Sequence, residues 1–231
     1  VPSNRQLACS MLSRDLVVER PIPGAAAAAA AAAQTASGEK KAKAPKSTYW
    51  SRLSGPVKAE VVQGLTNALT SETARPVLRQ LYELIPEVYQ HLSESGEAAA
   101  LWGNLLPTVF TMASSTAEVL RVGALEVFSQ LALAVGSGLF RAYFEVIQKL
   151  IAGALGDAAY AVKLAGLRAA VAFLEALEKE DEKGGRLAGL RALLPGMLGV
   201  VEGAIRESRE EDANAALEAL VELAETRPAF F

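Results

Sequence analysis

Val119-Leu120-Arg121-Val122-Gly123-Ala124-Leu125 decides the fold of this chain, because two other segments repeat its pattern. The counterparts are Val77-Leu78-Arg79-Gln80-Leu81 and Ala161-Val162-Lys163-Leu164-Ala165-Gly166-Leu167. Each has a basic residue just inside an expected helix start, followed by small and aliphatic residues. The basic residues are 121 − 79 = 42 and 163 − 121 = 42 residues apart. Two equal spacings in this range indicate a repeated pair of helices.

The opening segment, Ser3-Asn4-Arg5-Gln6-Leu7-Ala8, has the same form but lies further away than one repeat. Its arginine precedes Arg79 by 79 − 5 = 74 residues, an excess of 74 − 42 = 32 over one period. The excess falls on a run of nine alanines (residues 25–33) and a lysine-rich stretch (residues 40–46). We interpret residues 17–48 as a low-complexity loop insertion. The lysines also resemble a nuclear-localisation or phosphate-binding patch.

Two prolines provide a second marker of the repeat. Leu105-Leu106-Pro107-Thr108-Val109-Phe110 resembles Leu193-Leu194-Pro195-Gly196-Met197-Leu198, and the prolines are 195 − 107 = 88 residues apart, or two repeats of 44. A proline inside an apolar helical pattern kinks the helix, and a kinked first helix is typical of HEAT repeats. The sequence therefore predicts an all-α fold, a right-handed α-solenoid of HEAT repeats made of antiparallel helix pairs.

One helix is expected at residues 3–16. Four helix pairs are expected at 54–69 with 73–92, 97–113 with 116–135, 138–155 with 158–180, and 185–206 with 210–225. These helices divide the chain into six segments. Residues 1–16 form the second helix of a truncated repeat, and the insertion covers 17–48. HEAT repeats follow at 49–95, 96–136, 137–183 and 184–231. We expect Ser71 and Asp157 to cap the helices that follow them. Both ends expose apolar residues, so we expect this chain to be part of a longer protein.

The composition excludes several classes of site. A net charge of −3 argues against direct nucleic-acid binding. One cysteine, Cys9, and one histidine, His91, exclude a disulfide framework within the chain and zinc sites of the usual ligand types. No phosphate-binding loop motif occurs, and no run of about 18 apolar residues suggests a membrane span. We therefore expect no catalytic, cofactor or metal site, and no enzymatic activity.

The candidate sites are consequently surfaces for other proteins. Arg79, Arg121 and Lys163 occupy equivalent repeat positions and could line an inner partner-binding surface; the alternative is that they bond to the neighbouring repeat. Acidic residues gather at residues 175–182 and 207–212. These clusters are either solvated helix faces or docking sites for a basic partner.

Three passages resemble importin-5-type (karyopherin beta-3) receptors of the importin beta family. They are Arg5-Gln6-Leu7-Ala8, Leu120-Arg121-Val122-Gly123-Ala124-Leu125-Glu126-Val127-Phe128, and the last repeat from Leu193 to Leu198 and from Ala219 to Phe231. The resemblance covers most of the chain outside residues 17–48. The alanine- and lysine-rich insertion departs from the family pattern, and so do the missing first helices.

The resemblance implies a nuclear transport receptor, present in the cytoplasm and the nucleus. Its expected partners are protein cargo with basic signals, the GTPase Ran in its GTP form, and nucleoporins, without a membrane. The family's amino-terminal repeats contribute to Ran binding through the second helix of each pair. The alternative is a HEAT-repeat scaffold for another assembly, such as a phosphatase scaffold subunit.

Overall fold

A computed structural model describes Cys9, residues 49–177 and residues 186–231 of this chain, and every element in those ranges is helical. The helix predicted at 3–16 and the insertion predicted at 17–48 lie outside the described residues, apart from Cys9. The short helix α3 (Tyr49–Arg52) precedes four helix pairs. These are α4 (Gly55–Ser71) with α5 (Arg75–Glu94), α6 and α7 (Ala98–Trp102, Leu105–Ala113) with α8 (Glu118–Val135), η2 and α9 (Ser137–Tyr143, Phe144–Leu155) with α10 (Tyr160–Ala176), and α12 and α13 (Arg186–Arg191, Leu194–Arg206) with α14 (Glu210–Thr226).

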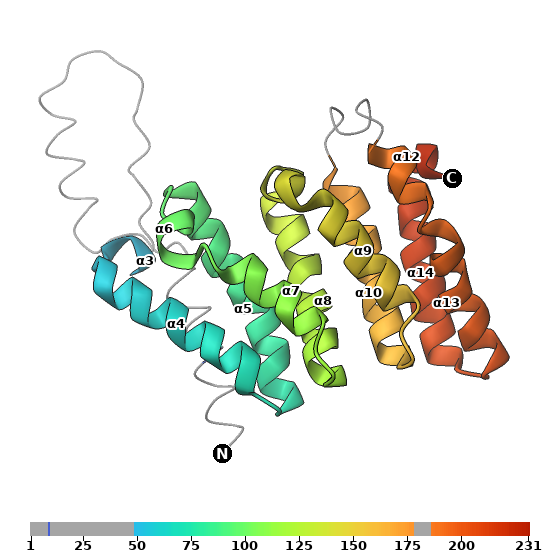
Figure 1. The fold of residues 1–231 in the computed structure, drawn as a ribbon, viewed down its shortest axis with the longest axis horizontal. Coiled ribbons are helices and arrows are strands. Elements are labelled where there is room, and N and C mark those ends of the chain that lie inside the picture. The colour runs from blue at the N-terminus through green and yellow to red at the C-terminus, as the bar shows by residue number, and fades with distance from the viewer. Residues whose placement is uncertain (1–8, 10–48, 178–185) are drawn as a thin grey trace, which may run out of the picture.

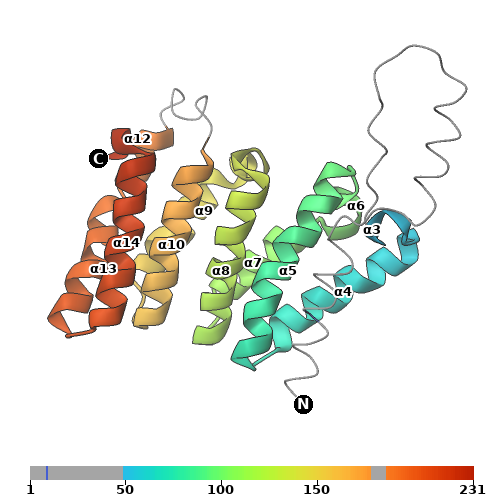
Figure 2. The same ribbon diagram turned by 180° about the vertical axis from the view of Figure 1, so that it is seen from behind.

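The pairs stack in two layers. The first helices (α4, α7, α9 and α13) face the viewer in Figure 1, and the second helices (α5, α8, α10 and α14) face the viewer in Figure 2. Within the second-helix layer, α5 packs on α8, α8 on α10 and α10 on α14. The structure confirms the predicted α-solenoid of stacked antiparallel helices. The repeat boundaries at 49–95, 96–136, 137–183 and 184–231 stay predictions.

The first helices of two pairs break just before their prolines. A turn at Gly103-Asn104 separates α6 from α7, and a turn at Ala192-Leu193 separates α12 from α13. Pro107 and Pro195 follow these turns at the third and second helical positions, where a missing N–H costs little because first-turn donors have no helical acceptor. The kinks that the sequence predicted are therefore turns that end one helix and start another.

Three of the second helices, α5, α8 and α10, begin two residues later than predicted, because a turn precedes each of them, whereas α14 begins at Glu210 as predicted. Side-chain oxygens of Glu72, Ser115 and Asp157 accept hydrogen bonds from the backbone N–H groups of Ala74, Ala117 and Ala159, at 2.9, 3.1 and 2.8 Å. Each alanine is the N-cap residue of α5, α8 or α10. A polar side chain that bonds two residues ahead closes such a turn.

Of the two predicted caps, Ser71 is wrong, whereas Asp157 accepts a backbone N–H bond at the start of α10 but from outside the N-cap position. Ser71 is the last residue of α4, and its hydroxyl donates to the carbonyl of Asn67 at 2.7 Å. Asp157 lies two residues before the N-cap position rather than at it. The turn before α5 is closed by Glu72, the residue after Ser71, and the turn before α10 is closed by Asp157 itself.

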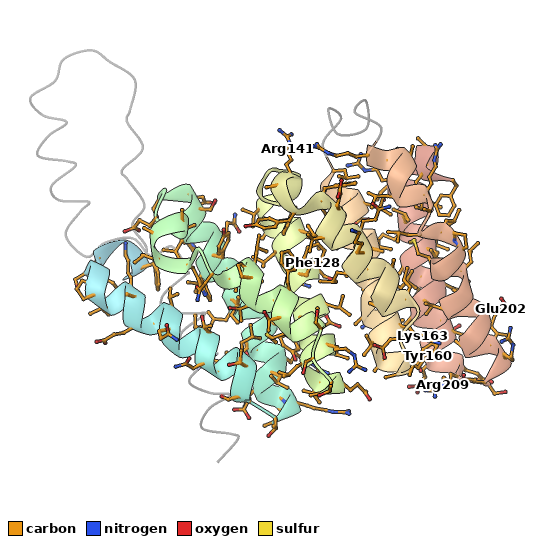
Figure 3. The ribbon with its side chains drawn as sticks, viewed as in Figure 1. Phe128, Arg141, Tyr160, Lys163, Glu202 and Arg209 are labelled. Atoms are coloured by element: carbon orange, nitrogen blue, oxygen red, sulfur yellow. The ribbon has the colours of Figure 1, made fainter. Side chains whose placement is uncertain are left out.

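An aromatic cluster fills the middle of the stack. Phe128 of α8 lies 5.1 Å from Phe140 of η2 and 5.8 Å from Phe173 of α10, centroid to centroid. Phe173 also contacts Phe140 at 6.0 Å and Phe144 of α9 at 5.9 Å. Phe128, labelled in Figure 3, is fully buried. Because these rings come from two successive pairs, the cluster joins the second pair to the third.

Residues Arg186–Arg206 are, by length and composition alone, apolar enough to cross a membrane. In the structure this stretch is divided into α12 and α13, and α13 packs on α14, α10 and α9. It buries Leu190, Leu193, Met197 and Val200 in the core. A third of the apolar window is buried, and a single helix of this kind is weak evidence for a membrane span, because a core helix passes the same test.

Candidate partner-binding surface

The second-helix layer presents charged side chains from three successive helices at one place. Arg79 of α5 is exposed, Glu126 of α8 is partly buried, and Arg168 of α10 is exposed. Arg168 lies 3.8 Å from Glu126, nitrogen to oxygen. Arg79 also acts on the Glu126 carboxyl electrostatically. We name these three residues the central charge cluster.

Burial dominates the electrostatics of Glu126. It raises the pKa of the Glu126 carboxyl above its ordinary value, although Arg168 and Arg79 both act to lower it. The phenol of Tyr82 in α5 lies in the same region, because a Cβ atom on Gly123 would come within 2.7 Å of its oxygen. Burial and the neighbouring Glu126 charge raise the pKa of Tyr82 to about 12. The two arginines therefore hold an anion that is poorly solvated and only loosely paired.

Replacing Glu126 with Gln tests this assignment. A raised carboxyl pKa in the folded state means that stability is lost as pH rises through the unfolded and then the folded pKa. Gln resembles the protonated form. We therefore expect the difference in melting temperature, Glu126→Gln minus the original chain, to be more positive at pH 7 than at pH 4. Thermal denaturation at several pH values measures the difference. Glu83→Gln, at an exposed acid of α5, is the control, and equal pH dependence of the two variants would contradict the assignment.

Arg121, one of the predicted site residues, bonds to the neighbouring repeat. Its Nε and Nη2 atoms donate to the two carboxylate oxygens of Asp157 at 2.8 and 2.9 Å. Its Nη1 atom donates to the carbonyls of Ser115 and Thr116, both at 3.0 Å. Arg121 therefore ties the turn before α8 to the turn before α10, in the planar two-bond geometry that guanidinium groups favour.

The Arg121–Asp157 pair makes stability depend on pH. Burial alone would raise the pKa of Asp157, but the hydrogen bonds from Arg121 and from the N–H of Ala159 hold it below its ordinary value. A lowered carboxyl pKa stabilises the fold above the unfolded pKa, and this stability is lost as pH falls through the folded pKa. We expect Asp157→Asn to lower the melting temperature most at pH 7 and progressively less below about pH 4. A difference that stays constant with pH would show that the carboxylate charge is unimportant.

The other two predicted site residues have different surroundings. Lys163, four residues into α10 and partly buried, lies near Asp157 and acts to lower the pKa of that carboxyl. Figure 3 shows Lys163 at the same end of the stack as Tyr160 and Arg209. The Arg209 guanidinium covers the Tyr160 ring at 4.9 Å. Arg79 alone of the three predicted residues belongs to the central charge cluster.

The sequence analysis missed Glu126 and Arg168, although a signal was present. They are 168 − 126 = 42 residues apart, one repeat period, and carry opposite charges. Opposite charges at equivalent positions of neighbouring second helices predict an ion pair across the layer. Leu133, with 54 % of its surface exposed, was also missed.

Two grooves accompany these charges. One of about 420 Å³ lies between α5 and α8, lined by Glu83, Glu87 and Gln90 on one side and Gln130 and Leu133 on the other. A second, of about 540 Å³, opens on the first-helix layer between α7 and α9, beside Phe110 and Leu150. Among the described residues, no group of three or more His, Cys, Asp or Glu side chains could hold a metal ion.

Solved structures of one protein share this fold. Karyopherin Kap121p bound to the SUMO protease Ulp1p has a TM-score of 0.65 and 20 % identity, covering 100 % of this chain and 20 % of Kap121p. Kap121p bound to RanGTP has a TM-score of 0.63 and 18 % identity, covering 100 % and 19 %. Kap121p bound to Nup53p has a TM-score of 0.65 and 19 % identity, covering 100 % and 20 %. The chain thus spans about a fifth of the length of Kap121p, and at these identities the likeness establishes the fold.

A family model assigns the sequence more directly. The model described as "IPO5-like, TPR repeats" matches residues 73–231. No curated protein sequence matches the chain. TPR repeats have a period of about 34 residues, so the spacing of 42 seen here is that of HEAT repeats despite the family's title. Because the match covers more than half of the sequence, the chain belongs to the IPO5-like family of helical-repeat proteins.

Proposed function

We propose that this chain forms part of a nuclear transport receptor and that its second-helix layer binds Ran in the GTP form. The observation that carries the proposal is the central charge cluster, which places Arg79, Glu126 and Arg168 on three successive second helices. Family membership and the shared fold with Kap121p, solved in complex with RanGTP, support it. A surface of both charge signs selects a partner by electrostatic complementarity.

The remaining partners follow from the same proposal. Cargo with basic signals would meet acidic side chains, of which α14 carries six (Glu210, Glu211, Asp212, Glu218, Glu222 and Glu225) and no lysine or arginine. Nucleoporins are proposed because Kap121p has been solved with Nup53p. A receptor that exchanges such partners would move between cytoplasm and nucleus. Its role would be that of a binding protein rather than an enzyme.

Binding of Ran in its two nucleotide states tests the proposal. We expect the chain to bind the GTP form at least about tenfold more tightly than the GDP form, a difference of about 1.4 kcal/mol. Biolayer interferometry with immobilised chain measures both affinities. Equal affinity for the two forms, or no binding of either, would contradict the proposed function.

A matched pair of variants tests which layer binds. Ala161 of α10 and Ala152 of α9 are both exposed helical alanines, one in each layer. Ala161 lies seven residues, or about two helical turns, before Arg168 and therefore on the same face. We expect Ala161→Tyr to weaken binding of the GTP form and Ala152→Tyr to leave it unchanged. The reverse order would assign Ran to the first-helix layer.

A further inference from the structure

The groove between α5 and α8 continues the central charge cluster along the helices. Arg79 precedes Glu83 by four residues, and Glu126 precedes Gln130 by four, so each groove residue lies one turn beyond a cluster residue. Leu133 follows Gln130 by a further three residues, opposite Glu87 and Gln90. The surface thus changes in one direction from two arginines around Glu126 to acidic and polar residues, and then to Leu133.

The two arginines retain donors for a partner. Arg79 makes no hydrogen bond and no ion pair within 4.0 Å with any residue that the structure describes. Among the residues that the structure describes, Arg168 has one ion pair, to Glu126 at 3.8 Å, which is longer than a hydrogen bond. A guanidinium group has five N–H donors. A carboxylate brought between Arg79 and Arg168 would therefore gain donors that Glu126 leaves unused.

The apolar end of the groove is an exposed leucine. Leu133 is 54 % exposed, whereas Leu131 and Ala132 beside it are fully buried. An apolar side chain of a partner would cover Leu133, and each Å² of apolar surface removed from water contributes about 25 cal/mol. Between the two ends, Glu83 offers an exposed carboxylate to a cation.

Taking the second-helix layer as the partner-binding surface proposed above, we infer that this groove binds an extended protein segment of the pattern acidic–x–basic–x–apolar. Four residues of a helix rise about 6 Å, and two residues of an extended chain rise about 6.6 Å. Alternate side chains of such a segment, running in the direction of α5 and α8, therefore match successive turns. The acidic residue meets Arg79 and Arg168, the basic residue meets Glu83, and the apolar residue meets Leu133.

Synthetic peptides test the pattern. The first peptide is Glu-Ser-Lys-Ser-Leu flanked by Gly-Ser spacers. The second peptide, for comparison, is Lys-Ser-Glu-Ser-Leu with the same spacers, in which the two charges are exchanged. We expect the original 231-residue chain to bind the first peptide at least about fivefold more tightly than the second, as measured by fluorescence anisotropy. Equal affinity for the two peptides would overturn the inference.

Exchanging the charges of the surface should exchange the preference. In the triple variant Arg79→Glu, Arg168→Glu and Glu83→Lys, we expect the second peptide to bind more tightly than the first. Arg206→Glu, at an exposed arginine of α13 in the first-helix layer, should keep the original preference. Circular dichroism and the melting temperature establish that each variant is folded.

Leu133→Ser isolates the apolar contact, with Leu198→Ser as its control because Leu198 of α13 is 50 % exposed. We expect the first to weaken both peptides several-fold and the second to weaken neither. Assaying GTP-loaded Ran in parallel separates the two proposals. If the chain does not distinguish the two peptides but binds Ran in a GTP-dependent way, the groove assignment alone is overturned. If the chain distinguishes the peptides but does not bind Ran in a GTP-dependent way, the proposed function alone is overturned.

Discussion

Phe128→Ala is expected to destabilise this chain by about 3–5 kcal/mol, because truncating a fully buried aromatic removes its transfer free energy and leaves a cavity. Phe128 has no exposed surface and contacts Phe140 and Phe173. The neighbouring rings belong to the next helix pair, so the cavity opens at the joint between two repeats. For a chain of this size the melting temperature should fall by roughly 6–20 °C.

Thermal and urea denaturation measure this loss. Phe231→Ala is the matched control, because Phe231 is 55 % exposed and its ring contact is with Phe230. We expect the control to change stability by less than about 1 kcal/mol. A comparable loss in the two variants would mean that the aromatic cluster does not hold the second and third pairs together.

Gly166→Ala is expected to destabilise the chain by about 1–3 kcal/mol, because the added methyl group has no room. A Cβ atom at Gly166 of α10 would lie 2.8 Å from the Ala154 Cβ and 3.3 Å from the Ala154 carbonyl carbon in α9. Backbone atoms cannot rotate away as a side-chain tip can. The helices α9 and α10 would therefore have to separate.

Gly153→Ala gives the opposite expectation. Gly153 is an exposed residue inside α9, and an added Cβ would meet nothing within 4 Å. Alanine is favoured over glycine in a helix interior by about 0.8–1.0 kcal/mol, so this variant should be more stable. Urea denaturation of the two variants distinguishes packing from helix propensity. A gain in stability for both would show that α9 and α10 are not in close contact at Gly166.

The helical repeat could be predicted from sequence because it depends on local patterns and on a period. The spacing of Arg79, Arg121 and Lys163 located the second helices to within about two residues at their starts. The starts themselves depend on side-chain bonds to Ala74, Ala117 and Ala159. The side chains that accept those bonds are of three different types, Glu72, Ser115 and Asp157. A search for one type of capping residue could therefore not locate all three helix starts.

The roles of the repeated basic residues could not be predicted, because they depend on contacts across repeats. Arg121 has a carboxylate partner 36 residues away in Asp157. At the equivalent position, Arg79 lies near Glu126 instead. Equivalent repeat positions therefore share a backbone geometry but not an electrostatic environment. The pair Glu126 and Arg168 was accessible in principle, since it combines the repeat period with opposite charge.

Hydrogen–deuterium exchange of the chain with and without GTP-loaded Ran tests the central claim, that the second-helix layer is the binding surface. Amide exchange reports local opening and slows where a partner covers and stabilises a helix. We predict slower exchange in α5, α8 and α10 with the GTP form, and no change in α4, α7 and α9. Protection confined to the first helices, or the same protection with the GDP form, would contradict the account.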